Sequence, residues 1–314
     1  MNLDALSLLP VLAQEGIVFI LGACIGSFLN VCIHRIPLGL SIVRPRSRCP
    51  QCETAIAWWD NIPLISWLLL RGKCRHCEAR IAFRYFLVEL ITGVLFLLCW
   101  MLLPTPVAFT GMLFVSWMLV IALIDLDTFT IPDGLVLSGC FVGLVASFAV
   151  PEIQGYSLSS PMGPWVMLYS AFSSLAGILL ASGFVLWLML IFEKILRREA
   201  MGLGDATLLG CIGAFCGIEG ALFALFAGSI IGTVVILPLM LLERVFGWKL
   251  TPRMDPDELD NPEGDALAEE LKFGIAIPFG PWLAIGGIVY FLFMRGWVYN
   301  YLEPFYSLWS MQYS

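Results

Sequence analysis

The chain has 314 residues, of which 60% are apolar and only 13% are charged. A water-soluble domain is typically about 45–50% apolar and about 25% charged. This composition excludes an ordinary soluble protein and indicates a multi-pass membrane protein. The formal net charge is −7, and eight acidic residues with no basic one lie within residues 255–270. Such a run predicts a solvated loop, with an acidic docking surface as the alternative.

Apolar runs of suitable length predict an all-α membrane helix bundle with about eight spans. A helix that crosses ~30 Å of hydrocarbon needs about 20 largely apolar residues. The first residues, Met1–Gly16, hold no Lys or Arg and no small-residue cleavage motif, so we expect a retained first helix rather than a cleaved signal peptide. The sixth run is short and glycine-rich and is the weakest of the set. The predicted spans cover residues 13–33, 85–103, 107–126, 134–150, 165–192, 206–218, 221–243 and 274–294.

The basic residues predict how these spans are oriented. Loops on the cytoplasmic side of a membrane carry an excess of Lys and Arg. With eight spans, sixteen of the 17 basic residues fall on one side and only Arg295 falls on the other. We therefore expect three cytoplasmic loops and both termini outside. Without the sixth span, the loop after Arg244 would change sides and the pattern would break.

Four of the ten cysteines form two C-x-x-C pairs, which predict a metal site. The pairs are Cys49-Pro-Gln-Cys52 and Cys74-Arg-His-Cys77. Four thiolates in this pattern suit a tetrahedral zinc ion, and a site with no open position is structural rather than catalytic. Disulfides and unliganded thiols are the alternatives, and a reducing compartment disfavours disulfides. A bound ion would fold a loop of about 50 residues that has little core of its own.

The other cysteines and the two histidines receive simpler interpretations. Six cysteines lie in or beside apolar spans, where we expect them to act as small hydrophobic residues. His76 lies within the second cysteine pair and could replace a sulfur ligand, although four cysteines make that unnecessary. His34 is expected at the membrane interface. The six cysteines are Cys24, Cys32, Cys99, Cys140, Cys211 and Cys216.

Two aspartates stand at the ends of apolar runs and are the candidate catalytic residues. Asp125 closes the third span, and Asp205 ends the glycine-rich segment 201–205 that opens the sixth. Pro132 is expected to break the helix, which places Asp125 on its last turn and Asp133 on the approach to the next helix. A carboxylate near hydrocarbon is costly and marks a functional site by default. Two carboxyl groups that share one proton can hydrolyse an amide, because one activates water while the other protonates the carbonyl oxygen.

The sequence lacks the motifs of serine hydrolases, of zinc proteases and of nucleotide-binding loops. The chain has no Gly-x-Ser-x-Gly, no His-Glu-x-x-His and no phosphate-binding Gly-x-x-x-x-Gly-Lys-Ser/Thr motif. No basic, aromatic-rich stretch suggests binding to nucleic acid. Residues 213–217 are interpreted as small-residue helix packing rather than as a nucleotide loop. Proton-coupled transport and structural capping stay open as alternative roles of the aspartates, as does a noncatalytic scaffold for the chain.

Six segments, in order, resemble the signatures of the type IV prepilin peptidases, a Gly-x-Gly-Asp class of membrane aspartic protease. The two cysteine pairs, the segment from Asp125 to Asp133 and the segment Gly202-Leu-Gly-Asp205 are three of them. The others are Gly26-Ser-Phe-Leu-Asn-Val31 with His34-Arg-Ile-Pro37, Arg84-Tyr-Phe-Leu-Val-Glu89-Leu-Ile-Thr-Gly93, and Pro278-Phe-Gly-Pro-Trp-Leu-Ala284. The long acidic loop between Arg244 and Lys272 departs from the family pattern.

The resemblance implies a specific reaction and site. Asp125 and Asp205 would be the catalytic pair, supported by Gly202 and Gly204, with Asp127 as the alternative to Asp125. Type IV prepilins and type II secretion pseudopilins would be cleaved after a glycine at the cytoplasmic face of the inner membrane. The new N-terminus would then be methylated from S-adenosylmethionine, for which no binding residues can be named. Besides these substrates, only membrane lipid is an expected partner.

Remaining features concern packing and domain organisation. Glu89 is interpreted as a buried acid that ties spans together, with binding of the substrate's amino group as the alternative. Glycine pairs at 22/26 and 228/232 are spaced for close helix contact. The expected division is a first span (1–34), a cysteine-bearing loop (35–84), a membrane core (85–243), an acidic loop (244–273), and a last span with an outside tail (274–314).

Overall fold

A computed structural model describes residues 11–157, 163, 165–196, 202–246, 278–298 and 301. Within these ranges all regular elements are helices, and the only extended pairing is two isolated bridges in the cysteine-bearing loop. The prediction of an all-α membrane bundle is therefore confirmed. The acidic run at 255–270 lies outside the described residues.

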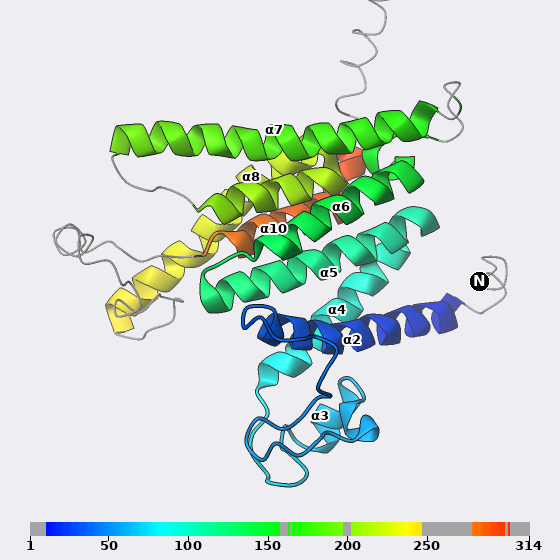
Figure 1. Ribbon diagram of the computed structural model, residues 1–314, viewed down its shortest axis with the longest axis vertical. Coiled ribbons are helices and arrows are strands. Elements are labelled where there is room, and N and C mark those ends of the chain that lie inside the picture. Colours follow the sequence, from blue (N-terminus) through cyan, green and yellow to red (C-terminus); the bar gives the residue numbers. More distant parts are fainter. Residues whose placement is uncertain are drawn as a thin grey trace, which may run out of the picture.

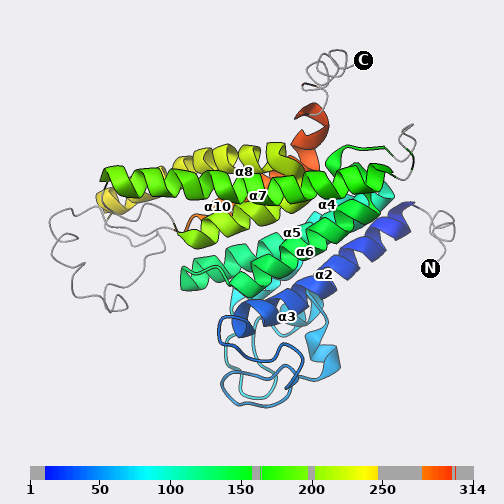
Figure 2. The same cartoon turned by 45° about the horizontal axis from the view of Figure 1, so that its top comes forward.

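Long helices form one bundle, with a small loop-rich unit at its edge (Figures 1 and 2). That unit connects α2 to α4 and contains the short helices η1 and α3. The long helices are α2 (Val11–Arg35), α4 (Phe83–Leu102), α5 (Thr105–Thr128), α6 (Asp133–Ala149), α7 (Trp165–Leu196), α8 (Leu203–Phe246) and α10 (Gly280–Val289). The short ones are η1 (Trp58–Asn61), α3 (Ile65–Leu69), η2 (Pro151–Gln154) and η4 (Tyr290–Met294), which continues α10.

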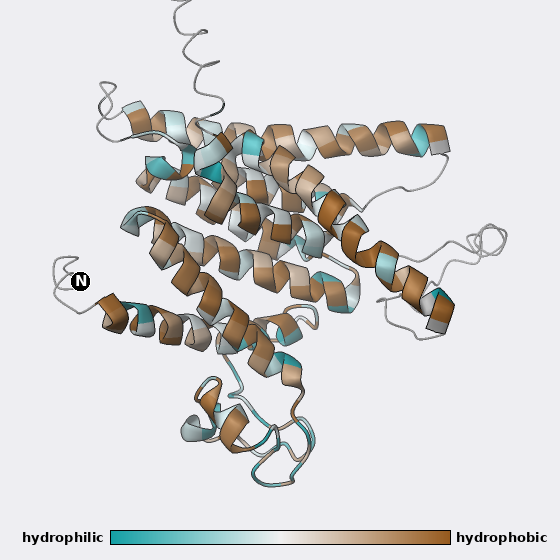
Figure 3. Cartoon of the chain, turned by 180° about the vertical axis from the view of Figure 1, so that it is seen from behind, coloured by the Kyte–Doolittle hydropathy of each residue, from teal (hydrophilic) through white to brown (hydrophobic). Residues whose placement is uncertain are grey.

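The predicted spans fall on these helices. Among the described residues, six helices are long and apolar enough to cross a membrane, and α6 is a shorter apolar helix. Apolar colour dominates the long helices in Figure 3. The predicted start of the last span, residue 274, lies outside the described residues, and α10 begins at Gly280. The sixth and seventh predicted spans both belong to α8, which is 44 residues long.

Helix α8 is broken at Gly217, and the break makes it a hairpin of two arms. Gly217 has φ 67° and ψ −177°, a conformation that is open essentially to glycine alone. Both arms pack on α10, because Gly287 faces Ile212 of the first arm and Gly286 faces Ala224 of the second. The short sixth span and the seventh span are therefore separate segments.

The break frees a backbone carbonyl inside the bundle, and side chains from neighbouring elements satisfy it. Ala214 O accepts hydrogen bonds from Ser147 Oγ at 3.1 Å, Gln154 Nε2 at 3.0 Å and Ser174 Oγ at 2.8 Å. An unpaired carbonyl in an apolar interior costs several kcal/mol by order of magnitude. These bonds connect α6, η2 and α7 to the broken helix and fix where it turns.

Aromatic rings join the centre of the bundle. Phe114 of α5 contacts Phe215 of α8 and Phe291 of the last span, with ring centroids 5.1 and 5.2 Å apart. All three side chains are fully buried. This contact holds together the helices that begin or end near the two candidate aspartates.

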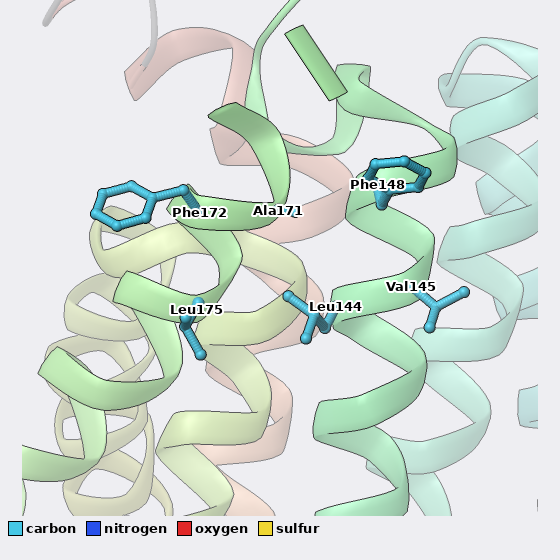
Figure 4. Close-up of a pocket in the computed structure, with 6 residues that line it drawn as sticks. All are labelled: Leu144, Val145, Phe148, Ala171, Phe172 and Leu175. Atoms are coloured by element: carbon cyan, nitrogen blue, oxygen red, sulfur yellow. The ribbon is translucent and has the colours of Figure 1, made fainter. Parts of the chain in front are cut away.

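A hollow between α6 and α7 is lined by apolar side chains alone (Figure 4). It lies near the end of α6 remote from Asp133, so it is not part of the aspartate site. An apolar surface is expected where a helix pair faces hydrocarbon. The lining residues are Leu144, Val145, Phe148, Ala171, Phe172 and Leu175.

Glycines allow α2 to approach α4 closely, as the 22/26 spacing predicted. A Cβ on Gly22 would lie 2.8 Å from the Gly93 Cα, and one on Gly26 would lie 2.8 Å from the Glu89 Cα. The pair at 228/232 faces Trp282 in the same way. Backbones that approach this closely gain van der Waals contact, which is a main attraction between helices in lipid.

Substitution of Gly26 by Ala should destabilise the protein by about 1–3 kcal/mol, because overpacking forces α2 and α4 apart. A Cβ on Gly16 of the same helix would have no neighbour within 4 Å, so Gly16→Ala is the matched control and should be neutral or stabilising. Thermal unfolding of both variants in detergent measures the difference. Equal midpoints would contradict this account of the contact.

Candidate active site and cysteine cluster

Asp125 lies on the last turn of α5, as expected, and is buried. Its side chain is only 4% exposed. The helix ends three residues later because Phe129 adopts a left-handed conformation, and its N–H bonds back to Asp125 O at 2.9 Å. Pro132 then starts α6, whose first residue is Asp133. The turn between two helices therefore follows the first candidate aspartate directly.

Asp205 lies in the first turn of α8 and is also buried, at 9% exposure. Its N–H donates to Gly202 O at 3.1 Å. A helix N-terminus favours a negative group because its first amides carry partial positive charge. Gly204, the residue before Asp205, packs against Ile131 in the turn that follows α5, so residues eighty positions apart in the chain lie at the same end of the bundle.

A third element, the start of α10, completes the site. The backbone N–H of Gly280 donates to Asp125 Oδ2 at 3.0 Å. A Cβ at position 280 would lie 2.6 Å from that oxygen, so a side chain there would push the carboxylate away. Gly280 and Gly204 both pack against Ile131. A Cβ at position 280 would lie 3.2 Å from the Ile131 side chain, and a Cβ at position 204 would lie 2.9 Å from it. Two glycines thus let α8 and α10 converge on the turn after α5.

Asp127 points to a different neighbour. Its Oδ1 accepts from Arg84 Nη1 at 2.6 Å, and both side chains are partly exposed. Arg84 also donates to Leu123 O at 3.2 Å. Asp127 therefore connects α5 to the start of α4, whereas Asp125 faces Gly280 and Asp205. Because Asp125 and Asp127 are two residues apart on a helix, their side chains point to different faces.

Two buried carboxyl groups at the same end of the bundle, together with one backbone amide, can perform acid–base chemistry on an amide. One carboxylate can accept a proton from water while the other group protonates the substrate's oxygen. Gly202 and Leu203 are exposed and Gly204 is partly exposed, so the backbone before Asp205 is accessible from outside the bundle. Asp125 Oδ2 accepts a hydrogen bond from the Gly280 amide, and the backbone N–H of Asp205 donates to Gly202 O.

The four predicted cysteine ligands come together in the loop between α2 and α4. All four sulfur atoms lie within 4.8 Å of one another, with Cys49–Cys77 at 3.7 Å and Cys52–Cys74 at 4.0 Å. A tetrahedral zinc ion with Zn–S bonds of about 2.3 Å requires sulfur atoms ~3.8 Å apart. The cluster therefore fits a tetrahedral metal. His76 is exposed and is not one of the four clustered ligands.

The two cysteine pairs are folded alike. In the first pair, Cys49 N–H donates to Thr54 O and Glu53 N–H donates to Cys49 O. In the second pair, Cys74 N–H donates to Ala79 O and Glu78 N–H donates to Cys74 O. Glu53 and Glu78, each next to the second cysteine of its pair, have φ of 53° and 56°. Matching turns on both sides hold four sulfur atoms around one point, which is what a metal knuckle requires.

The thiols of this cluster differ in acidity without a metal. Hydrogen bonds from the side chain and backbone of Thr54 lower the pKa of Cys52 to about 6. The Ala79 backbone lowers the pKa of Cys77, but burial and the neighbouring thiols outweigh it and raise that pKa to about 12. Four thiolates this close repel one another, so a cation is needed for all of them to ionise.

Glu89 ties the cysteine-bearing loop to the membrane helices. Its Oε2 accepts the N–H of Leu64 at 2.8 Å, and Ser27 of α2 also hydrogen-bonds to it. Leu64 has a positive φ of 63°. Nearby, Asn30 Nδ2 donates to Tyr85 O at 3.1 Å. These internal partners fit the interpretation that Glu89 links structural elements.

Sequence reasoning missed two participants. The Gly280 amide was not predicted, although the Pro-Phe-Gly-Pro segment signals a tight start to a helix. The pairing of Arg84 with Asp127 also was not predicted, because nothing in the spacing of residues 43 positions apart shows it. Both depend on how separate helices meet.

Comparisons with known proteins agree with this geometry. Residues 20–103 match the family model "Bacterial Peptidase A24 N-terminal domain", and residues 112–237 match "Type IV leader peptidase family". The first match contains the cysteine cluster and Glu89, and the second contains both aspartates. No solved structure matches the chain. These matches give no support to the transporter alternative.

Curated relatives extend the match to most of the chain. A protein of Myxococcus xanthus named prepilin leader peptidase/N-methyltransferase is 35% identical, over 86% of this chain and 87% of its own length. Proteins of the same name from Aeromonas hydrophila and Neisseria gonorrhoeae are each 33% identical, over 86% and 69% of this chain and 88% and 79% of their own lengths. The predicted resemblance is confirmed, and the chain belongs to the type IV leader peptidase family.

Proposed function

We propose that this chain is a membrane aspartic endopeptidase that cleaves the leader of type IV prepilins and related pseudopilins. The observation that carries the proposal is the convergence of Asp125, the Gly280 amide and the Gly204–Asp205 segment around Ile131 in a chain of this family. A substrate that stays in the membrane would present its leader at the ends of the helices. That is where both aspartates lie, one at the end of α5 and one at the start of α8.

The proposed mechanism assigns a role to each group of the site. One carboxylate takes a proton from water, and the water oxygen attacks the scissile carbonyl carbon. The other carboxyl group donates its proton to the carbonyl oxygen, which gives a gem-diol intermediate. The first group, now protonated, then gives its proton to the leaving amine while the second takes a proton back from a gem-diol hydroxyl, so the pair again holds one proton. The Gly280 amide orients Asp125, and the exposed Gly202–Gly204 segment leaves room for the backbone of the substrate.

Cleavage releases a free amino group, and we propose that the chain then methylates it. The support is the name of the relatives, which joins the two activities. S-adenosylmethionine would supply an electrophilic methyl group. We assign no residue of this chain to the binding of that donor.

We propose further that zinc fills the cysteine cluster and that the aspartates face the cytoplasm of a bacterial inner membrane. The sulfur separations support zinc. The positions of the basic residues support the orientation. Three helices end at or near a basic residue, and these ends all lie on the left in Figure 1: α2 at Arg35, α7 near Lys194 and α8 near Arg244. Arg295, in contrast, lies near the end of the last span, away from the start of α10. The division into a first span, cysteine-bearing loop, core, acidic loop and last span remains part of this proposal.

Asp125→Asn and Asp205→Asn should each lower the rate of leader cleavage by about 10²–10⁴-fold, because general acid–base groups contribute that much. Asp127→Asn, which removes the pairing with Arg84, should keep most of the activity. A prepilin in membrane vesicles, followed by its change in mobility, measures all three. Wild-type rates for both Asp125→Asn and Asp205→Asn would remove the peptidase assignment to this pair.

Gly280→Ala should lower cleavage on the order of 10²-fold, because a Cβ 2.6 Å from Asp125 Oδ2 displaces the carboxylate. A Cβ on Gly134, in the first turn of α6, would have no neighbour within 4 Å. Gly134→Ala is therefore the matched control and should keep its activity. If the two variants cleave equally fast, the Gly280 contact does not position Asp125.

Cys49→Ser and Cys74→Ser should lose the bound zinc, measured per chain by elemental analysis of purified protein. A structural zinc site contributes folding energy directly, so the loop of these variants should also be cut sooner by protease. Cys24→Ser changes an exposed cysteine of α2 outside the cluster and serves as the control. Unchanged zinc in Cys49→Ser would exclude this site.

A further inference from the structure

An exposed apolar surface lies on the loop-rich unit that carries the cysteines. It consists of side chains of η1 and α3, and we call it the η1–α3 patch. Its two most exposed members are Trp58 at 77% and Leu69 at 79%. Exposed apolar patches on a small polar unit mark a surface that contacts something. The patch comprises Trp58, Trp59, Ile65, Leu68 and Leu69.

Side-chain direction separates this patch from the inner side of α3. Ile65, Leu68 and Leu69 are spaced i, i+3 and i+4, so they share one face of the helix. Trp67 points the other way and packs on Phe83 and Phe86 of α4, with ring centroids 5.5 and 5.2 Å apart. The helix is therefore attached to the bundle by one side and presents the patch on the other.

The depth of α3 follows from its contact with α4. Helix α4 has 20 residues, which makes it ~30 Å long and only just able to cross the hydrocarbon core. The Leu64 N–H, at the start of α3, bonds to Glu89. Glu89 lies six residues after the first residue of α4, which is about 9 Å along its axis. Helix α3 therefore lies beside the first turns of α4 at the level of the membrane boundary, not beyond it.

The pictures agree with this placement. In Figures 1 and 2, α3 and its loops lie beside the ends of α2 and α4 that adjoin them. Figure 3 shows apolar residues on this unit as well as on the spanning helices.

Charge indicates which kind of surface the unit meets. Residues 36–82 contain seven basic residues and three acidic ones. Positive charge beside an apolar, tryptophan-bearing face is the pattern of an element that lies in a membrane interface, where the tryptophans sit among headgroups and the basic residues attract anionic lipid. The basic residues are Arg44, Arg46, Arg48, Arg71, Lys73, Arg75 and Arg80.

We propose that the η1–α3 patch is inserted into the lipid of the adjoining leaflet and holds the cysteine-bearing unit at a fixed depth beside α4. The occupant of the patch is phospholipid. A segment that connects two spans would then be an interfacial membrane element rather than a free loop. This proposal does not depend on the peptidase assignment.

Photocrosslinking of the full-length protein in nanodiscs with anionic phospholipid tests the proposal. A photoreactive amino acid replaces Leu69 or Trp58, one position at a time, and mass spectrometry identifies what it labels. Phe172, in the apolar hollow of Figure 4, is the positive control, and Gln51, exposed between two cysteines, is the negative control. We expect phospholipid adducts at positions 58, 69 and 172, at least several-fold above position 51.

The same experiment can overturn the proposal. Adducts at position 172 but none at 58 and 69 would show that the patch lies in water. Adducts of 58 and 69 to a second copy of the chain or to an added prepilin, in place of lipid, would show a protein-binding surface.

A second variant separates insertion from folding. Leu68→Gln combined with Leu69→Gln leaves Trp67 and the cysteines unchanged, so bound zinc should match the wild type. The lipid adduct at position 58 should then fall several-fold. An undiminished adduct at 58 with zinc retained would mean that the α3 face does not anchor the unit.

Discussion

The site depends on one constraint, which is that a carboxyl group inside an apolar bundle must find polar partners within the protein. Asp125 finds the Gly280 amide 155 residues away in the chain. A side chain at position 280 would collide with that carboxylate, and Gly204 lets α8 approach Ile131 beside it. A buried carboxylate without such a partner would cost several kcal/mol by order of magnitude. The ends of α5, α8 and α10 thus lie around the Asp125 carboxylate, and the hydrogen bond to that carboxylate holds the start of α10 in place.

The same requirement explains the break in α8. A 44-residue helix is too long for one crossing, and ending the first arm at Gly217 exposes the Ala214 carbonyl. Three side chains from α6, η2 and α7 donate to that oxygen. Because irregular backbone is tolerated in a membrane protein only where its polar groups are paired, this network makes the hairpin possible. The first arm can then be short, which brings Asp205 to the same end of the bundle as Asp125.

The cysteine-bearing unit is stabilised in a different way from the membrane helices. It buries few side chains of its own, and its fold depends on the four sulfur atoms and on contacts with α4. Glu89 links the unit to the membrane helices through Leu64 and Ser27. A metal would stabilise the inside of the unit, and lipid would cover the η1–α3 patch. Together, these two proposed environments would replace the hydrophobic core that a segment of this size lacks.

The sequence alone determined the class of the protein, its spans and its candidate chemistry. Apolar run length predicts spans because hydrocarbon sets a minimum helix length, and C-x-x-C spacing predicts the cluster because its ligands are close in the chain. Glycine spacing likewise predicted that the first span packs closely on another helix, although it did not show which one. The pattern also named Asp125 and Asp205, through their positions at the ends of apolar runs and through family motifs.

Only the tertiary structure decided which groups meet. The Gly280 amide, the pairing of Arg84 with Asp127 and the three donors to Ala214 come from helices far apart in sequence. In lipid every helix is apolar on most faces, so amphipathic periodicity cannot show which side faces a neighbour. The place of α3 beside α4 is of the same kind, since it follows from the hydrogen bond between Leu64 and Glu89 and from the packing of Trp67 on Phe83 and Phe86.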